Sequence, residues 1–95
     1  MKATHESLLE VLEEAKALVL RPENDFAWST WKDREAALAE IDGYLAKVKK
    51  GDLSSYSDLW MLFAPTGDLQ EVSLSSGWAH EFLALASRFD DLKNA

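Results

Sequence analysis

Apolar residues recur three and four positions apart in three stretches of the chain, at about residues 4–20, 30–50 and 77–92. This spacing places apolar side chains on one face of an α-helix, because the helix has about 3.6 residues per turn. Each stretch therefore predicts an amphipathic helix with a buried apolar face. The predicted buried faces consist of Leu8, Val11 or Leu12, Ala15 and Leu18 or Val19 in the first helix, Trp31, Leu38, Ile41, Leu45 and Val48 in the second, and Trp78, Phe82, Leu85, Phe89 and Leu92 in the third.

Residues with strong local preferences mark the ends of these helices. Pro22 ends the first helix, since proline disfavours the helical conformation in the residue before it. Thr30 and Asp33 resemble a capping box at the start of the second helix. Gly51 follows a lysine-rich last turn and suits the left-handed conformation found just past a helix. Gly43, inside the second helix, is a candidate for a close contact with another helix.

The pattern changes between the second and third helices. Residues 59–64 are uniformly apolar, which suits a buried strand, although residues 53–63 also contain apolar residues at helical spacing. Residues 70–75 alternate in polarity, as a strand does. A Pro-Thr-Gly-Asp turn separates the two segments, with Gly67 expected at a positive φ angle. Because a strand needs a partner for its backbone groups, the two segments predict a β-hairpin.

The predicted architecture is a single α+β domain over residues 1–95, in the order helix, helix, β-hairpin, helix. A chain of 95 residues is long enough for one hydrophobic core. A hairpin that packs on helices by one side leaves part of its outer face and both its edges uncovered. This indicates an interaction surface, and a homodimer is the simplest assembly that covers it. The candidate surface residues are Trp60, Leu62, Glu71 and Ser73.

The net charge and the length of the apolar runs restrict the partners and the cellular location that we expect. The chain has 10 basic and 17 acidic residues, a formal net charge of -7. This balance disfavours nucleic acid and anionic membranes as partners, because like charges repel. The longest apolar run, residues 59–64, is far shorter than the roughly 20 residues of a membrane-spanning helix. The amino terminus lacks the pattern of a signal peptide, so we expect a cytoplasmic protein.

Few residues are arranged for catalysis or metal binding. The chain has no cysteine, which excludes thiolate nucleophiles and cysteine-ligated metals. Its two histidines, His5 and His80, lack the paired spacing of a zinc site. The neighbouring carboxylates Glu13–Glu14 and Asp90–Asp91 point in different directions on a helix and do not form a hydrolase pair. We expect no enzyme activity, no metal and no cofactor.

Four tryptophans are many for a chain of 95 residues. Each one buries a large apolar area, which helps a small core to be sufficient. We expect them in the core; the alternative is that one or two lie on a binding face, where tryptophan is enriched. The four are Trp28, Trp31, Trp60 and Trp78.

Part of the chain resembles a group of small uncharacterised bacterial proteins. The likeness rests on Leu62-Phe63-Ala64-Pro65-Thr66-Gly67, then Leu69-Gln70-Glu71-Val72-Ser73, then Gly77-Trp78, and extends to Asp25-Phe26-Ala27-Trp28-Ser29 and Phe89-Asp90. No activity is attached to that group, so the resemblance implies a bacterial origin and carries over no catalytic residue.

The sequence favours a non-catalytic interaction module, such as an immunity-like or regulatory partner of another bacterial protein. Two alternatives stay open. One is a small enzyme or ligand-binding domain whose site gathers His80, Asp58 and Glu71 only in the folded chain. The other is a DNA mimic, because carboxylates are frequent between Glu6 and Asp25, although Lys16 and Arg21 interrupt them.

Overall fold

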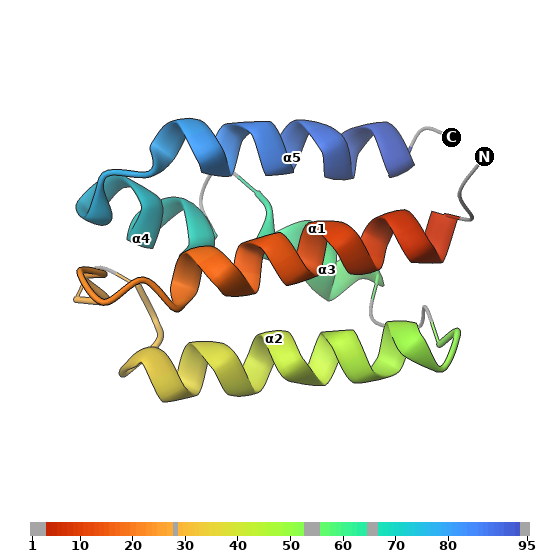
Figure 1. Cartoon of the computed structure of the whole chain (residues 1–95), viewed down its shortest axis with the longest axis horizontal. Coiled ribbons are helices and arrows are strands. Elements are labelled where there is room, and N and C mark those ends of the chain that lie inside the picture. Colours follow the sequence, from red (N-terminus) through yellow and green to blue (C-terminus); the bar gives the residue numbers. More distant parts are fainter. Residues whose placement is uncertain (1–3, 28, 53–55, 65–66, 94–95) are drawn as a thin grey trace.

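The computed structural model describes residues 4–27, 29–52, 56–64 and 67–93, which form five α-helices and no strand (Figure 1). The helices are α1 (Thr4–Val19), α2 (Arg34–Lys49), α3 (Tyr56–Leu62), α4 (Asp68–Ser76) and α5 (Ala79–Lys93). The predicted α+β fold with a β-hairpin is therefore wrong, and the chain is a small helical domain.

The three long helices lie side by side, with α1 between α2 and α5 and antiparallel to both (Figure 1). The two short helices complete the domain, and α4 packs against α5. The molecule measures 36 × 23 × 20 Å, and the start of α1 and the end of α5 lie at the same end of it (Figure 1). Within the described ranges, none of the helices has the length and apolar character needed to cross a membrane.

The long helices confirm the predictions from apolar spacing. The predicted face of α1 is buried, from Leu8 to Val19, as are Ile41, Leu45 and Val48 of α2. In the third stretch, the side chains of Trp78, Phe82, Leu85 and Phe89 are buried and Leu92 is partly buried. These faces form one hydrophobic core.

The second helix begins later than predicted. Its N-cap is Asp33, whose carboxylate accepts a hydrogen bond from the backbone N–H of Ala36 at 2.9 Å. Thr30 therefore does not cap this helix, and the buried Trp31 precedes it. The carboxyl end matches the prediction, with Gly51 at a φ of 78°.

Gly43 marks no helix contact, since a Cβ there would have no neighbour within 4 Å. The helix–helix contact predicted at this position is therefore wrong. In α2 the glycine is exposed to solvent.

Residues 59–63 belong to a helix and its end, not to a strand. Leu59, Leu62 and Phe63 are buried, whereas Trp60 and Met61 are 43% and 56% exposed. Buried positions three and four apart are the signature of a helix. The uniform apolar character of this run made it resemble a strand that is buried on both faces.

Residues 70–75 form most of α4 and show the same period. Leu69, Val72 and Ser73 are fully buried, whereas Leu74 is 59% exposed. Since no hairpin exists in the described residues, its uncovered strand edges do not exist either. The structural basis for the predicted homodimer is thereby removed.

Gly67 precedes α4 for a reason other than the predicted one. Its φ is −82°, so the predicted positive φ is wrong. A Cβ at this position would instead meet the backbone oxygen of Met61 and lie 2.9 Å from that of Leu62. Glycine allows the start of α4 to approach the end of α3 closely. Pro65 and Thr66, the rest of the predicted turn, lie outside the described residues.

The connection between α1 and α2 is attached to both ends of α4. At one end the carboxylate of Asp68 accepts hydrogen bonds from the backbone N–H and the hydroxyl of Thr30, at 2.9 and 2.6 Å. At the other end the backbone of Asp25 bonds to the hydroxyls of Ser75 and Ser76, both at 2.9 Å. These contacts fix the position of α4 relative to the connection between α1 and α2.

Candidate functional site

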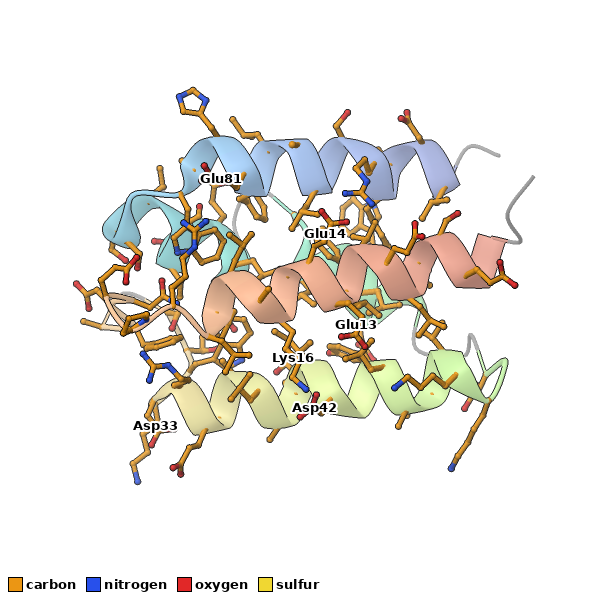
Figure 2. All side chains as sticks on the ribbon, in the orientation of Figure 1. Glu13, Glu14, Lys16, Asp33, Asp42 and Glu81 are labelled. Atoms are coloured by element: carbon orange, nitrogen blue, oxygen red, sulfur yellow. The ribbon has the colours of Figure 1, made fainter. Side chains whose placement is uncertain are left out.

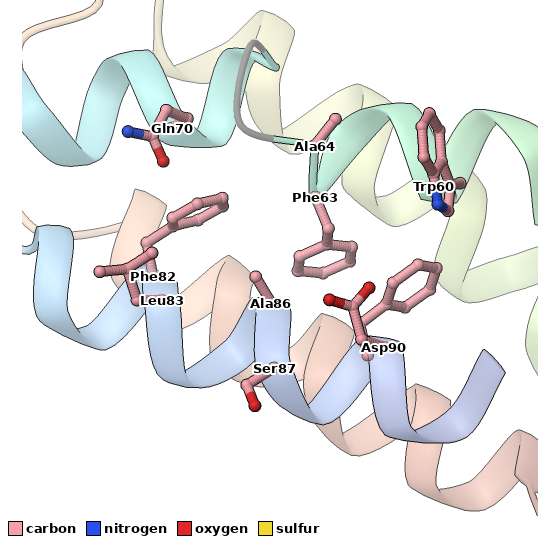
Figure 3. A pocket seen from close by; sticks show the side chains of 10 residues that line it. Trp60, Phe63, Ala64, Gln70, Phe82, Leu83, Ala86, Ser87 and Asp90 are labelled. Carbon is pink, nitrogen blue, oxygen red and sulfur yellow. The ribbon is translucent and has the colours of Figure 1, made fainter. Parts of the chain in front are cut away.

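An open groove of about 700 Å³ lies between α3, α4 and α5 (Figure 3). The rings of Phe63, Phe82 and Phe89 are buried and form its floor. Trp60 and Leu83 line it as well, although they are 43% and 58% exposed. The volume falls within the roughly 300–1,000 Å³ typical of binding pockets. The groove thus combines an aromatic floor with large apolar side chains that remain in contact with solvent.

Helical periodicity explains which side chains reach the groove. Along α5, Phe82 and Phe89 are seven positions apart and share one face, and Leu83, Ala86 and Asp90 follow its flank. From the other wall, Trp60 and Phe63 reach the groove at a spacing of three. The ring of Phe63 stacks on that of Phe89, with centroids 4.8 Å apart and planes 22° apart. This stacking joins the end of α3 to α5 and closes the floor.

The two ends of the groove differ in polarity. Gln70 of α4 and Phe82 lie toward one end, and Trp60 and Asp90 toward the other (Figure 3). Asp90 is exposed and its carboxylate points into the space beside Phe63 (Figure 3). The groove therefore has a neutral end and an anionic end.

The walls of the groove carry no positive charge. The sequence has no lysine or arginine from residue 51 to residue 87, a stretch that includes α3, α4 and most of α5. The next basic residue, Arg88, pairs with Glu14 of α1 at 2.6 Å, on another side of α5 from the groove. Asp58 and Glu71 add carboxylates to α3 and α4. Among the residues that line the groove itself, Asp90 is the charged one.

The four predicted surface residues do not form one surface. Trp60 lines the groove, but Leu62 is only 4% exposed and Ser73 is fully buried. The hydroxyl of Ser73 donates to the carbonyl of Gln70 at 2.7 Å, which satisfies it inside the fold. Glu71 is partly exposed on α4 but does not line the groove. Ser73 is therefore inaccessible to a partner, and Leu62 borders only the small cavity that Tyr44 and Asp58 also line.

Leu83 and Asp90 are exposed groove residues that were not among the predicted surface residues. Leu83 lies beside the predicted apolar seam of α5 and is exposed, whereas its neighbour Phe82 is buried. In the sequence, Leu83 could have been identified as a large apolar residue beside, but not within, the regular apolar face of this helix. Among the tryptophans, Trp31 and Trp78 belong to the core as predicted, and Trp28 lies outside the described residues.

The residues proposed for an assembled polar site are not brought together. Asp58 lines a small cavity of about 250 Å³ with Glu40 and Tyr44, and neither His80 nor Glu71 lines it. Burial, together with the charges of Glu40 and Asp58, raises the pKa of Tyr44. His80 is exposed near the start of α5.

No metal site is formed by the side chains that the structure describes, since no three histidine, aspartate or glutamate residues are grouped to hold an ion. The side chain of the other histidine, His5, lies outside them.

The carboxylates of α1 face two different helices. Glu14 lies on the side of α5, whereas Glu13 lies on the side of α2 (Figure 2). Lys16 lies on the side of α1 that faces α2, where it pairs with Asp42 at 2.8 Å (Figure 2). The hydrogen bond with Asp42 raises the pKa of Lys16. Acidic and basic groups thus alternate on this side of the molecule, which is unlike the aromatic groove.

This chain matches no protein-family model, no curated protein and no solved structure.

Proposed function

We propose that this chain is a non-catalytic interaction module of a bacterial cytoplasm, an immunity-like or regulatory partner that binds another protein in the aromatic groove. The observation that carries this proposal is the exposure of Trp60 and Leu83 around a floor of three phenylalanine rings. Aromatic anchors surrounded by apolar contacts are typical of the residues that dominate protein interfaces. An exposed apolar patch of this kind is removed from water when a partner covers it.

A smaller cavity is a weaker candidate for the binding site. It has a volume of about 340 Å³ and lies between α1 and α5. Two carboxylates and two guanidinium groups line it, from Glu14, Glu81, Arg21 and Arg88. The pair Glu14–Arg88 already satisfies two of these groups, and only Arg21 and Glu81 are left to meet a ligand. The aromatic groove is about twice as large, and four aromatic side chains line it.

The acidity of the chain fits docking to a basic partner. A net charge of -7 attracts a positively charged surface over a distance of about one Debye length, roughly 8–10 Å at physiological salt. Such attraction accelerates association and makes its rate fall as salt is added. The apolar groove then supplies the contacts that hold the complex.

Two leucines of nearly equal exposure provide a matched test. Leu83 lines the groove and is 58% exposed, and Leu74, on α4, does not line it and is 59% exposed. Leu83→Asp and Leu74→Asp introduce the same charge at exposed helical positions, so both variants are expected to remain folded. The wild-type chain is used to capture its partner from a lysate of the source organism, and the affinity of the identified partner for each variant is then measured.

Leu83→Asp is expected to weaken binding at least about tenfold, because it places a charge on an apolar contact, whereas Leu74→Asp keeps the wild-type affinity. A photo-reactive amino acid at position 83, but not at position 74, is expected to crosslink the partner inside cells. A partner that binds both variants equally, or the lack of any adduct at position 83, would contradict the proposal.

A further inference from the structure

We infer that the occupant of the aromatic groove is an amphipathic helix of the partner protein, and that it places an arginine side chain between Trp60 and Asp90. This inference rests on the proposed function and specifies the chemistry of the partner. Its basis is the length of the groove, the chemistry of its anionic end and the charge of its walls.

The length of the groove suits two turns of helix. Its lining follows α5 from Phe82 to Asp90, which is about 12 Å at the helical rise of about 1.5 Å per residue. Side chains at positions i, i+4 and i+7 of a docked helix span roughly 10.5 Å by the same rise. Three apolar side chains of such a helix can therefore cover the floor formed by Phe63, Phe82 and Phe89.

The anionic end of the groove has the two groups that recognise a guanidinium. Trp60 and Asp90 both line this end, from opposite walls (Figure 3). An indole face attracts a cation that stacks on it, and a carboxylate accepts two parallel hydrogen bonds from arginine. Lysine cannot make the planar, paired contact, so arginine is favoured. Gln70 at the other end is neutral and offers no comparable site.

The surrounding charge strengthens the attraction. Because residues 51–87 contain no lysine or arginine, no basic side chain of this stretch competes for Asp90. Arg88, two residues before Asp90, is held by Glu14 of α1. An incoming arginine therefore does not compete with Arg88 for Asp90; the side chain of Lys93, at the end of α5, lies outside the described ones.

A second copy of this chain is a poor occupant. Each copy has a net charge of -7, so two copies repel one another. The apolar faces of α1 and α5 are already used in the core. The charge therefore favours a basic segment of a different protein.

Synthetic helices test the inference directly. The probe is a stapled amphipathic peptide with leucines at i, i+4 and i+7 and one arginine beside the first or the last leucine, since either chain direction is allowed. A matched peptide carries citrulline, which keeps the shape of arginine without its charge. Affinities are measured by fluorescence anisotropy, and the resonance of the Trp60 indole N–H reports where each peptide binds.

Asp90→Asn and Asp91→Asn form the control pair. Both residues are exposed aspartates of α5, but Asp91 lines a different cavity, beside α1. The arginine peptide is expected to bind the wild-type chain about tenfold more tightly than the citrulline peptide. Asp90→Asn is expected to remove most of that preference, whereas Asp91→Asn retains it. Trp60→Leu is expected to reduce it in part, because the cation–π contact is lost.

The outcomes separate this inference from the proposed function. If the arginine and citrulline peptides shift the Trp60 resonance and bind equally, the arginine site is wrong and the groove remains a binding surface. If no helical peptide binds, but the natural partner is still lost in Leu83→Asp, the occupant is not a helix. A dimer in sedimentation that disappears with Leu83→Asp would identify a second copy as the occupant and overturn the inference.

Discussion

The side-chain oxygen of Asn24 accepts a hydrogen bond from the indole N–H of Trp78 at 2.6 Å. The amide nitrogen of the same side chain donates to the backbone oxygens of Leu18 and Val19, each at 2.8 Å. These oxygens belong to the last turn of α1, where backbone acceptors lack partners within the helix. One side chain thus ends α1 and satisfies the polar group of a tryptophan that is 1% exposed.

Asn24→Ala is expected to destabilise the fold by about 2–3 kcal/mol, because it leaves a buried indole N–H and two helix-end carbonyls without this partner. The free energy of unfolding is measured by urea denaturation. Glu23→Ala, at the exposed preceding residue, is the control and should change it by less than about 0.5 kcal/mol. Equal losses in the two variants would show that the Asn24 contacts do not stabilise the domain.

Two glycines give opposite predictions for the same substitution. Gly43→Ala is expected to stabilise the domain by about 0.5–1 kcal/mol, because the position is an open helical site and alanine is the better helix former. Gly67→Ala is expected to destabilise it, because the new Cβ would meet the backbone oxygens of Met61 and Leu62. Thermal unfolding of both variants measures the difference. A rise in Tm for Gly67→Ala would mean that α3 and α4 do not approach each other closely.

The cap of α2 can be tested in the same way. Asp33→Ala is expected to cost about 1 kcal/mol, because the Ala36 N–H loses its acceptor at the start of the helix. Thr30→Ala removes only the hydroxyl bond to Asp68 at an exposed position and should cost less. The reverse order in urea denaturation would restore Thr30 as the cap that the sequence predicted.

The long helices could be predicted from the sequence because several turns repeat the same apolar spacing. The seam of α5, for example, continues from Phe82 to Phe89 and beyond. The short helices α3 and α4 have seven and nine residues, so the apolar spacing repeats over only about two turns in each. In α4 the alternating polarity around Val72 fits a strand equally well. Amino-acid composition argues against strands more clearly. Strands are rich in β-branched residues, and Val72 is the only β-branched residue in these two helices.

The candidate site could be predicted only in part. Trp60 was identified as a surface candidate, but for a hairpin that does not form in the described residues. The groove depends on where α3 ends relative to α5, and that distance is set by the stacking of Phe63 on Phe89. These two residues are far apart in the sequence, and apolar spacing within a single helix carries no information about such a pair. The absence of lysine and arginine from residues 51–87 was visible in the sequence, but only the fold shows that this stretch surrounds a groove.

Tyr44 makes the free energy of unfolding of the domain depend on pH in the alkaline range. Partial burial disfavours its phenolate, and the charges of Glu40 and Asp58 add to this, so the pKa of Tyr44 is raised in the folded chain. A group whose pKa is higher in the folded than in the unfolded state stabilises the fold below its unfolded pKa, about 10 for tyrosine. That contribution is lost as pH rises through the folded pKa. The Tyr44→Phe variant has no phenol to ionise. Its free energy of unfolding should therefore fall less steeply above about pH 10 than that of the wild type.

Comparison with Tyr44→Phe isolates this effect from that of Lys16, whose raised pKa acts in the same direction and is present in both proteins. Urea denaturation at several values between about pH 8 and about pH 12 gives the two curves. The ultraviolet absorbance of tyrosinate, taken as the difference between the proteins, gives the pKa of Tyr44 itself. Asp58→Asn should lower that pKa, because one of the charges opposing ionisation is removed. Parallel stability curves for wild type and Tyr44→Phe would show that burial and the two carboxylates do not act on Tyr44 in solution.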